Sequence, residues 1–295
     1  MHRVLEIPAC NLCRAHLKSL FSHESIAIVA REFLSSQAAE NMATEITQKY
    51  KNNECSNWRV NTLDNVGMES SDVLTIGTPF NVAISTDTGA YFDEVRKTAL
   101  RERSSGRPNP SDLLRLELDD LWPRGCAVGR EEGGDERGKS SGQVRVMPGP
   151  TRWKDGFVHV DDFSGLSVRG GTFSGNVYLQ LPSNGNGTGI EGAKDGDNNN
   201  RGHLQIWDVD VTSDDFRNAE NGELPRCLAS QDARSQVRLR KHLGQGVNVG
   251  VGPGDLVLLC TQRPHAVVGF EEGLRISYQS FIEYRGEGEQ LVIDG

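Results

Sequence analysis

The sequence PGDLVLLCTQRPHAVVGFEEGLRISYQSFI, residues 253–282, predicts three successive β-strands. We expect them at Asp255–Leu259, His265–Phe270 and Leu274–Ile282, because these segments are rich in branched apolar residues and the gaps between them contain Gly or Pro. Short strands with such short connections are typical of a β-sandwich or jelly roll, and not of a sheet built from βαβ units.

The same pattern extends upstream. Further strands are expected at 144–146, 157–159, 176–181 and 204–211, most of them bounded by Gly, Pro or Asn. Residues 183–202, SNGNGTGIEGAKDGDNNNRG, have low complexity and are predicted to form a flexible surface excursion between two strands.

Helices are predicted to dominate the N-terminal part of the chain. Strands are expected at 26–30 and 73–76. Ser35 or Ser36 is expected to cap one helix, a second is expected over 91–103, and Asn109-Pro110 begins a third that includes 113–121. We therefore expect residues 1–125 to pack on a core of residues 126–295 in one integrated domain. Residues 125–142, charged and glycine-rich, predict a mobile loop.

Composition excludes several classes of protein. The chain has 295 residues and a formal net charge of −9, which argues against a general nucleic-acid binder because such proteins need a basic face. No apolar run approaches the ~20 residues needed to span a bilayer, and the N-terminus lacks the apolar segment of a secretory signal. The lone Cys10-x-x-Cys13 motif is predicted to be two free thiols rather than a zinc site. We expect a cytoplasmic protein without a membrane or nucleic-acid partner, and the oligomeric state is not predicted.

Two separated motifs could together hold a metal ion. His159 and Asp161, in the sequence Phe157-Val158-His159-Val160-Asp161, would point to the same side of an extended strand. His265 follows Arg263-Pro264 in the later strand region. Two imidazoles and one carboxylate on one face of an ion, with open positions opposite, form the facial triad of non-haem iron oxygenases. His203 is predicted to have a structural or surface role instead, and Asp162 is a candidate to orient a ligand.

A cation follows in the next predicted strand. Arg275 and Ser277 share a strand face, so that a guanidinium fork and a hydroxyl could reach the same carboxylate. A buried arginine among apolar residues would be costly without such a partner.

These motifs together carry a resemblance. His159-Val160-Asp161, the distant Arg263-Pro264-His265 and the downstream Arg275-Ile276-Ser277 resemble the Fe(II)- and 2-oxoglutarate-dependent dioxygenase superfamily, as does the turn Pro253-Gly254-Asp255 before the distal histidine. The resemblance covers roughly residues 142–284. It implies a double-stranded β-helix core, a jelly-roll and cupin-like fold that is mainly β with flanking helices.

The resemblance also implies cofactors and roles. Fe(II) would be held by His159, Asp161 and His265, and 2-oxoglutarate, used together with O2, would be anchored by Arg275 with help from Ser277. The chain would then be an enzyme that oxidises an unactivated C–H bond by hydroxylation, desaturation or ring closure. Halogenating members have Gly or Ala in place of Asp161, so halogenation is not expected.

Further site residues are predicted from their positions. Tyr178 and Gln180 alternate on one strand and could bond the co-substrate. A basic segment that contains Arg145, Arg152 and Lys154 precedes His159-Val160-Asp161, the HxD motif. This segment is either a binding region for substrate carboxylates or a solvated edge. Arg145 could instead contact the co-substrate. Phe157 could line the substrate site, although an aromatic residue there is more often part of the core.

The substrate is expected to be a small carboxylated metabolite or amino acid. The glycine-rich insertions and the basic segment are similar to those of algal kainoid synthases, which close a ring on a substrate with several carboxylates. Two other hypotheses remain open: a cupin-type metalloenzyme that works without 2-oxoglutarate, and a non-catalytic binding barrel.

Overall fold

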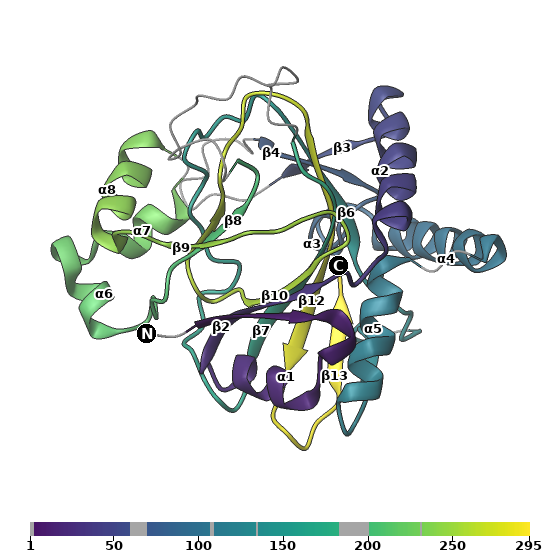
Figure 1. Ribbon diagram of the computed structural model, residues 1–295, viewed down its shortest axis with the longest axis horizontal. Coiled ribbons are helices and arrows are strands. Elements are labelled where there is room, and N and C mark those ends of the chain that lie inside the picture. Colours follow the sequence, from purple (N-terminus) through teal and green to yellow (C-terminus); the bar gives the residue numbers. More distant parts are fainter. Residues whose placement is uncertain (1–2, 60–69, 107–108, 134, 183–200, 231) are drawn as a thin grey trace.

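The computed structural model describes residues 3–59, 70–106, 109–133, 135–182, 201–230 and 232–295. Two β-sheets form its core, and helices lie on the outside (Figure 1). The predicted excursion at 183–202 lies almost entirely outside the described residues, which resume at Arg201.

The major sheet has the strand order β1-β2-β10-β7-β12-β6-β4-β3, and β13 and β5 extend it beside β12. The central strands β10, β7, β12 and β6 are antiparallel to their neighbours. The strands of this sheet are β1 (Arg3–Pro8), β2 (Ser25–Arg31), β3 (Ser56–Arg59), β4 (Ser70–Ile76), β5 (Cys126–Val128), β6 (Gln143–Pro148), β7 (Gly171–Gln180), β10 (Leu256–Cys260), β12 (Leu274–Tyr284) and β13 (Leu291–Asp294).

The minor sheet has the order β11-β8-β9 and is antiparallel. Its strands are β11 (His265–Val267), β8 (Leu204–Ile206) and β9 (Val247–Val249). An isolated bridge between His159 and His265 adds the HxD segment to its edge. From β6 to β12 the chain passes back and forth between the two sheets, except that β8 and β9 are successive strands of the minor sheet. The strand orders are β6-β12-β7-β10 and HxD-β11-β8-β9. This arrangement confirms the predicted double-stranded β-helix.

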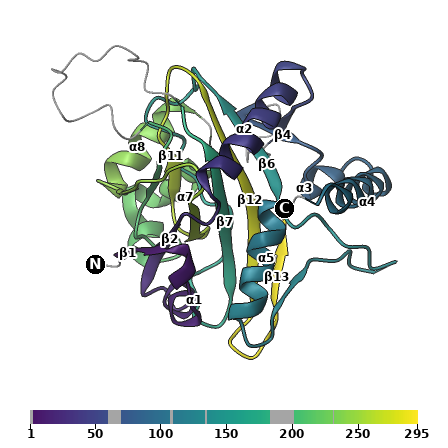
Figure 2. The same ribbon diagram turned by 45° about the vertical axis from the view of Figure 1, so that its right-hand side comes forward.

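Three helices cover the outer face of the major sheet: α1 (Arg14–Phe21), α2 (Ser36–Lys51) and α5 (Pro110–Leu121) (Figure 2). Two of the predicted caps are present, since the side chain of Ser35 accepts from the backbone of Ala38 and that of Asn109 accepts from Ser111. The helices bury a continuous apolar layer with the strands, and each fully buried Leu or Ile in such a layer contributes about 1.5–3 kcal/mol.

Two helices at one edge have a small core of their own. α3 (Phe80–Ala83) and α4 (Thr88–Ser105) enclose Tyr91 and Phe92, and α4 projects from the body of the molecule (Figure 2). No described helix is both long enough and apolar enough to cross a membrane.

Three more helices lie beside the minor sheet, opposite α2 and α5 in Figure 1: α6 (Asp214–Asn218), α7 (Leu224–Ala229) and α8 (Ala233–Leu243). They share a buried cluster with Trp207 after β8, Val158 in the HxD segment and Ala266 in β11. The short 3-10 turns Ala9–Asn11 and Ala219–Gly222 complete the described elements.

Several sequence predictions need correction. The segment 204–211 was predicted as one strand, but β8 ends at Ile206. Beyond this strand, Asp208 forms an ion pair of 2.5 Å with the buried Arg263. The strand predicted over 265–270 ends at Val267. The predicted loop at 125–142 contains β5, which pairs in parallel with β13. In the N-terminal part helices predominate, as predicted, but β1 to β4 also belong to the major sheet.

Candidate active site

Backbone pairing between distant segments brings the three predicted metal ligands together. His159 N–H donates to His265 O at 3.0 Å, and His265 N–H donates to His159 O at 2.9 Å. Asp161 N–H donates to Thr261 O at 3.0 Å, so the HxD segment runs antiparallel to the chain that leads into β11. Two residues apart on extended backbone, His159 and Asp161 face the same side.

Neighbouring elements fix this segment in place. The buried side chain of Gln236, on α8, bonds Val158 twice: its Oε1 accepts from Val158 N–H at 2.8 Å and its Nε2 donates to Val158 O at 3.0 Å. Gly156 has φ +84°, and a Cβ there would lie 2.1 Å from Val267 O. Only glycine therefore allows the chain to approach β11 so closely just before the HxD motif.

The ligand atoms converge. One ligand atom from each of His159, Asp161 and His265 lies within 4.8 Å of the others. Asp161 Oδ1 is 3.6 Å from His159 Nε2, and Asp161 Oδ2 is 3.5 Å from His265 Nε2. Among the described residues, no other group of three His, Cys, Asp or Glu side chains brings its ligand atoms this close together.

Each imidazole is oriented by a backbone carbonyl two residues earlier. His159 Nδ1 lies 3.0 Å from Phe157 O, and His265 Nδ1 lies 2.9 Å from Arg263 O. Because a carbonyl only accepts, Nδ1 carries a hydrogen in each ring, and Nε2, which is directed toward Asp161, is the nitrogen that would bind a metal ion after losing its proton. Metal-binding histidines are oriented in this way in many proteins.

The charges of the three groups suit a cation. Burial raises the pKa of Asp161, but the hydrogen bond from His265 and the charges of His265, His159 and Arg145 outweigh it, so the pKa lies below its usual value. Burial, with His265 nearby, lowers the pKa of His159. Burial is the largest single effect on His265 and lowers its pKa, but the hydrogen bond to Asp161, the charge of Asp161 and the carbonyl of Arg263 together outweigh it, so the pKa is raised. The donor set of two imidazoles and one carboxylate fits a divalent first-row metal ion.

A buried cation lies on the inner face of the major sheet. Arg275, on β12, is 6% exposed; its Nε donates to Gly202 O at 3.1 Å and its Nη2 to Tyr178 Oη at 3.1 Å. Its guanidinium also lies 4.9 Å from the centre of the Tyr178 ring. Ser277 lies opposite Tyr178 in the sheet and is 1% exposed, and its Oγ has no hydrogen-bond partner among the described residues.

The inner face thus carries groups that suit an anion, and it is linked to the metal ligands by Arg145, which lies opposite Ser277 and whose charge acts on Asp161. A guanidinium, a phenol and an unpaired buried hydroxyl together match the hydrogen-bond demands of a carboxylate. Gln180, also predicted here, donates its Nε2 to Leu274 O at 3.2 Å at the end of β7.

The predicted substrate residues separate into two groups. Arg145 is buried on β6, opposite Ser277, and its charge acts on Asp161. The Arg145 side chain is enclosed, and this burial lowers its pKa to about 9. Phe157 stacks on the His159 ring with centroids 5.6 Å apart. Arg152 and Lys154 are exposed, and the Arg152 guanidinium lies over the Trp153 ring.

Two residues considered with the ligands have other contacts. Asp162 accepts from Ser164 N–H and from the Thr172 hydroxyl, so it organises the turn after the HxD motif. His203 Nδ1 accepts from Val251 N–H at 3.0 Å, in agreement with the predicted structural role.

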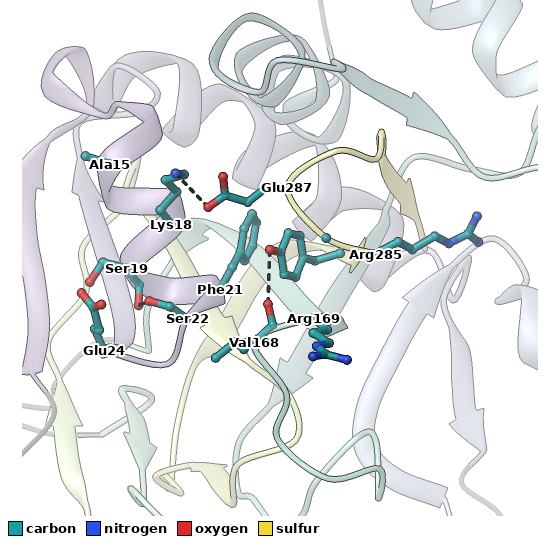
Figure 3. Close-up of a pocket in the computed structure, with 12 residues that line it drawn as sticks. Ala15, Lys18, Ser19, Phe21, Ser22, Glu24, Val168, Arg169, Arg285 and Glu287 are labelled. Carbon is teal, nitrogen blue, oxygen red and sulfur yellow. Dashed lines mark hydrogen bonds and ion pairs between the residues drawn. The ribbon is translucent and has the colours of Figure 1, made fainter.

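A separate hollow lies between α1 and the turn after β12 (Figure 3). It shares no residue with the metal ligands, and Phe21 and Tyr284 contribute to its lining. A 2.8 Å ion pair between Lys18 and Glu287 crosses it. It is therefore distinct from the candidate active site.

Comparison with known proteins gives likeness in structure alone. No protein-family model and no curated protein sequence matches the chain. An N-substituted L-amino acid dioxygenase from Burkholderia ambifaria, solved in complex with α-ketoglutarate, has 16% identity and a TM-score of 0.49, over 96% of this chain and 91% of that one. The non-haem α-ketoglutarate-dependent carbocyclase SnoK of nogalamycin biosynthesis has 15% identity and a TM-score of 0.46, over 98% and 99%. A prolyl-4-hydroxylase from Pseudomonas putida has 15% identity and a TM-score of 0.41, over 93% and 99%. What the site of this chain can do is decided by its own side chains.

Proposed function

We propose that this protein is an Fe(II)- and 2-oxoglutarate-dependent oxygenase that oxidises an unactivated C–H bond of a small carboxylated molecule. The observation that carries this proposal is the convergence of His159, Asp161 and His265 inside a β-helix whose major sheet carries the buried Arg275. A metal centre with two imidazoles and one carboxylate retains open positions for a chelating 2-oxoacid and O2.

The roles of the residues follow from their contacts. His159 and His265 would bind iron through Nε2, because their Nδ1–H groups are held by carbonyls. Asp161 would supply the anionic ligand. Arg275 would bind the distal carboxylate of 2-oxoglutarate as a fork, with the Tyr178 and Ser277 hydroxyls as further partners.

The overall reaction balances in a form that needs no other reductant. For hydroxylation, R–H, 2-oxoglutarate and O2 give R–OH, succinate and CO2. For ring closure, the substrate loses two hydrogens, and these leave with one oxygen atom as water. Iron with 2-oxoglutarate and O2 supplies the oxidising power, and the protein positions the target C–H bond.

Two further candidate functions use the same residues. A cupin-type metalloenzyme without 2-oxoglutarate would not need a carboxylate site at Arg275, and a non-catalytic barrel would not need a redox metal. The buried Arg275–Tyr178 pair beside an unpaired Ser277 hydroxyl favours the oxygenase.

The test is an anaerobic titration of the Fe(II)-loaded protein with 2-oxoglutarate, followed by the weak visible absorption of the chelate. We expect the band in the wild-type protein and in Arg285→Met, a matched control whose arginine forms a surface ion pair with Glu283. Arg275→Met should weaken 2-oxoglutarate binding by about 10- to 100-fold, since hydrogen bonds to charged groups contribute about 1.5–3 kcal/mol.

Each other result has a distinct meaning. Iron binding without the band would leave the metal centre and remove the co-substrate, in favour of the cupin-type metalloenzyme. Failure to bind iron would refute the proposal.

A further inference from the structure

The HxD segment is held along both of its edges, and a helix forms the second of these contacts. Along the first edge, His159 exchanges two backbone hydrogen bonds with His265, and Asp161 N–H donates to Thr261 O. On extended backbone the N–H and C=O groups of successive residues point to opposite edges, so those of Val158 point away from β11. Side chains of helix α8 meet them there.

Gln236 of α8 takes the place that a residue of a neighbouring strand would have. Its Oε1 accepts from Val158 N–H at 2.8 Å and its Nε2 donates to Val158 O at 3.0 Å. Two residues that face each other in an antiparallel ladder exchange the same pair of bonds. Gln236 is 4% exposed and Val158 is fully buried. Because an unpaired backbone group is costly to bury, these two bonds hold Val158 in its position.

Arg240, one turn further along α8, holds the chain just before the HxD motif. Its Nη2 donates to the carbonyl oxygens of Asp155 and Gly156, the latter at 2.7 Å. Its Nη1 donates to Gln205 Oε1 on β8 at 3.1 Å, which ties the same guanidinium to the minor sheet. Residues four apart lie on one face of a helix, so Gln236 and Arg240 hold one continuous stretch of chain.

The back of the HxD segment is also covered by this part of the molecule. Val158 and Val160 belong to the buried apolar cluster of helices α6, α7 and α8. His159 and Asp161 alternate with them and converge with His265. Helix α8 therefore contacts the outer edge of a segment whose front carries two of the three metal ligands, and a displacement of the helix would reach His159 through a single peptide group.

We propose that α8 is a positioning element of the metal centre, and that Gln236 and Arg240 set the metal affinity by fixing where His159 lies. Gln236 acts through the peptide groups of Val158, and Arg240 acts through the turn before it. Because coupling between two parts of a protein is reciprocal, binding of the metal ion stabilises α8 in turn. This inference rests on the metal centre of the proposed function and adds two positioning residues to it.

The first test is a calorimetric titration of the full-length protein with Mn(II). Gln236→Met keeps a linear side chain of similar length and removes both bonds to Val158. The Kd should rise about 10-fold, at the lower end of the range for groups that orient metal ligands. Asp232→Ala is the matched control, because it weakens the N-cap of the same helix and leaves the bonds of Gln236 in place. It should keep the wild-type affinity.

Two further measurements separate positioning from a general loss of stability. At saturating Co(II), the visible absorption spectrum depends on the coordination geometry, and it should change in Gln236→Met and not in Asp232→Ala. In the wild-type protein, metal loading should slow amide hydrogen exchange in α8 more than in α2, which packs on the outer face of the major sheet. This difference should be lost in Gln236→Met.

A second pair of variants covers the case in which Gln236→Met does not fold. Arg240→Met removes the bonds to the carbonyl oxygens of Asp155 and Gly156, and it should raise the Kd for Mn(II) about 3-fold, because it acts further from His159. Arg240→Lys retains a donor for one carbonyl and should recover part of this loss.

The outcomes are distinct. Equal Mn(II) affinity and equal Co(II) spectra in the wild type and Gln236→Met would overturn the inference and leave the metal centre in place. An equal loss of affinity in Asp232→Ala would also overturn it, since the stability of the helix alone would then explain the effect. Failure of the wild-type protein to bind these ions would instead refute the proposed function and this inference together.

Discussion

The two faces of the major sheet differ in chemistry, although they are formed by the same strands. On the outer face, Val144, Val146 and Ile276 pack under helices α1, α2 and α5. On the inner face, the residues between them include Arg145 and Ser277. β6 and β12 thus each contribute alternate residues to the apolar core and to the candidate active site.

The difference shows how this fold separates stability from chemistry. The outer face is apolar and covered, so it can offset the cost of enclosing charged groups on the inner face. The inner face carries the buried guanidinium groups of Arg145 and Arg275, whose enclosure costs free energy, and the Ser277 hydroxyl, which has no hydrogen-bond partner among the described residues. Substitutions on the two faces should therefore have opposite signatures.

The largest effect is expected at a metal ligand. His265→Ala removes one of two imidazole donors and should weaken Fe(II) or Mn(II) binding by more than about 100-fold, because even outer-shell partners of metal ligands contribute about 10- to 100-fold. Calorimetric titration measures this. His203→Ala is the matched histidine control and should retain metal affinity; equal loss in both variants would contradict the ligand assignment.

The next effect concerns the outer face. Ile276→Ala creates a cavity beneath the helices and should lower the free energy of unfolding by about 2–5 kcal/mol, as measured by denaturant titration. Below the unfolding transition its metal affinity should equal that of the wild type. A selective loss of metal binding in the folded variant would mean that the two faces are not independent.

The neighbouring residue on the inner face should behave in the opposite way. Ser277→Ala removes a buried hydroxyl without a described partner, so the free energy of unfolding should stay the same or rise by up to ~1 kcal/mol. Binding of 2-oxoglutarate should weaken by about 3- to 10-fold, which corresponds to one hydrogen bond. Ser280→Ala, on the outer face of the same strand, is the control and should leave this affinity unchanged.

The smallest effect is expected away from both faces. Asp232 caps α8, and hydrogen bonds from the Ser230 and Ser235 side chains and from Ser235 N–H lower its pKa to about 2. Asp232→Ala should cost about 1 kcal/mol. Because the pKa in the folded state is depressed, this contribution is complete above about pH 4 and is lost as the pH falls toward 2.

Unfolding measurements at pH 7, 5 and 3.5 would check the last prediction. The difference between the wild type and Asp232→Ala should be constant at the first two values and smaller at the third. A difference that grows as the pH falls would contradict the capping role. Metal and 2-oxoglutarate affinities at pH 7 should be the same in both proteins.

Much of the core was predictable because local patterns determine it. The alternation in 274–282 predicted β12, and the cap residues Ser35 and Asn109 predicted α2 and α5. The helices between β8 and β9 were not predicted, since 212–246 is polar and its apolar residues have meaning only against Trp207 and Val158.

The candidate site was predictable in part for the same reason. His159 and Asp161 share a strand face by simple alternation, and Arg275 and Ser277 do likewise. Gln279, whose Oε1 accepts from the buried Arg145, was not predicted, although it lies two residues from Ser277 on the same face. A neutral amide has no distinctive meaning in sequence, and its importance comes from its buried neighbours.

The sequence by itself determined the residue types of the site and the faces they occupy, because alternation along an extended strand is a local property. Only the tertiary structure decided which residues meet. Asp161 and His265 are 104 residues apart in the chain. The HxD segment pairs with His265 only through backbone hydrogen bonds between these distant segments. The same pairing turns both Nε2 atoms toward Asp161, and the β6–β12 register places Arg145 beside Ser277. Register of this kind is fixed by the packing of whole sheets, which no single segment specifies.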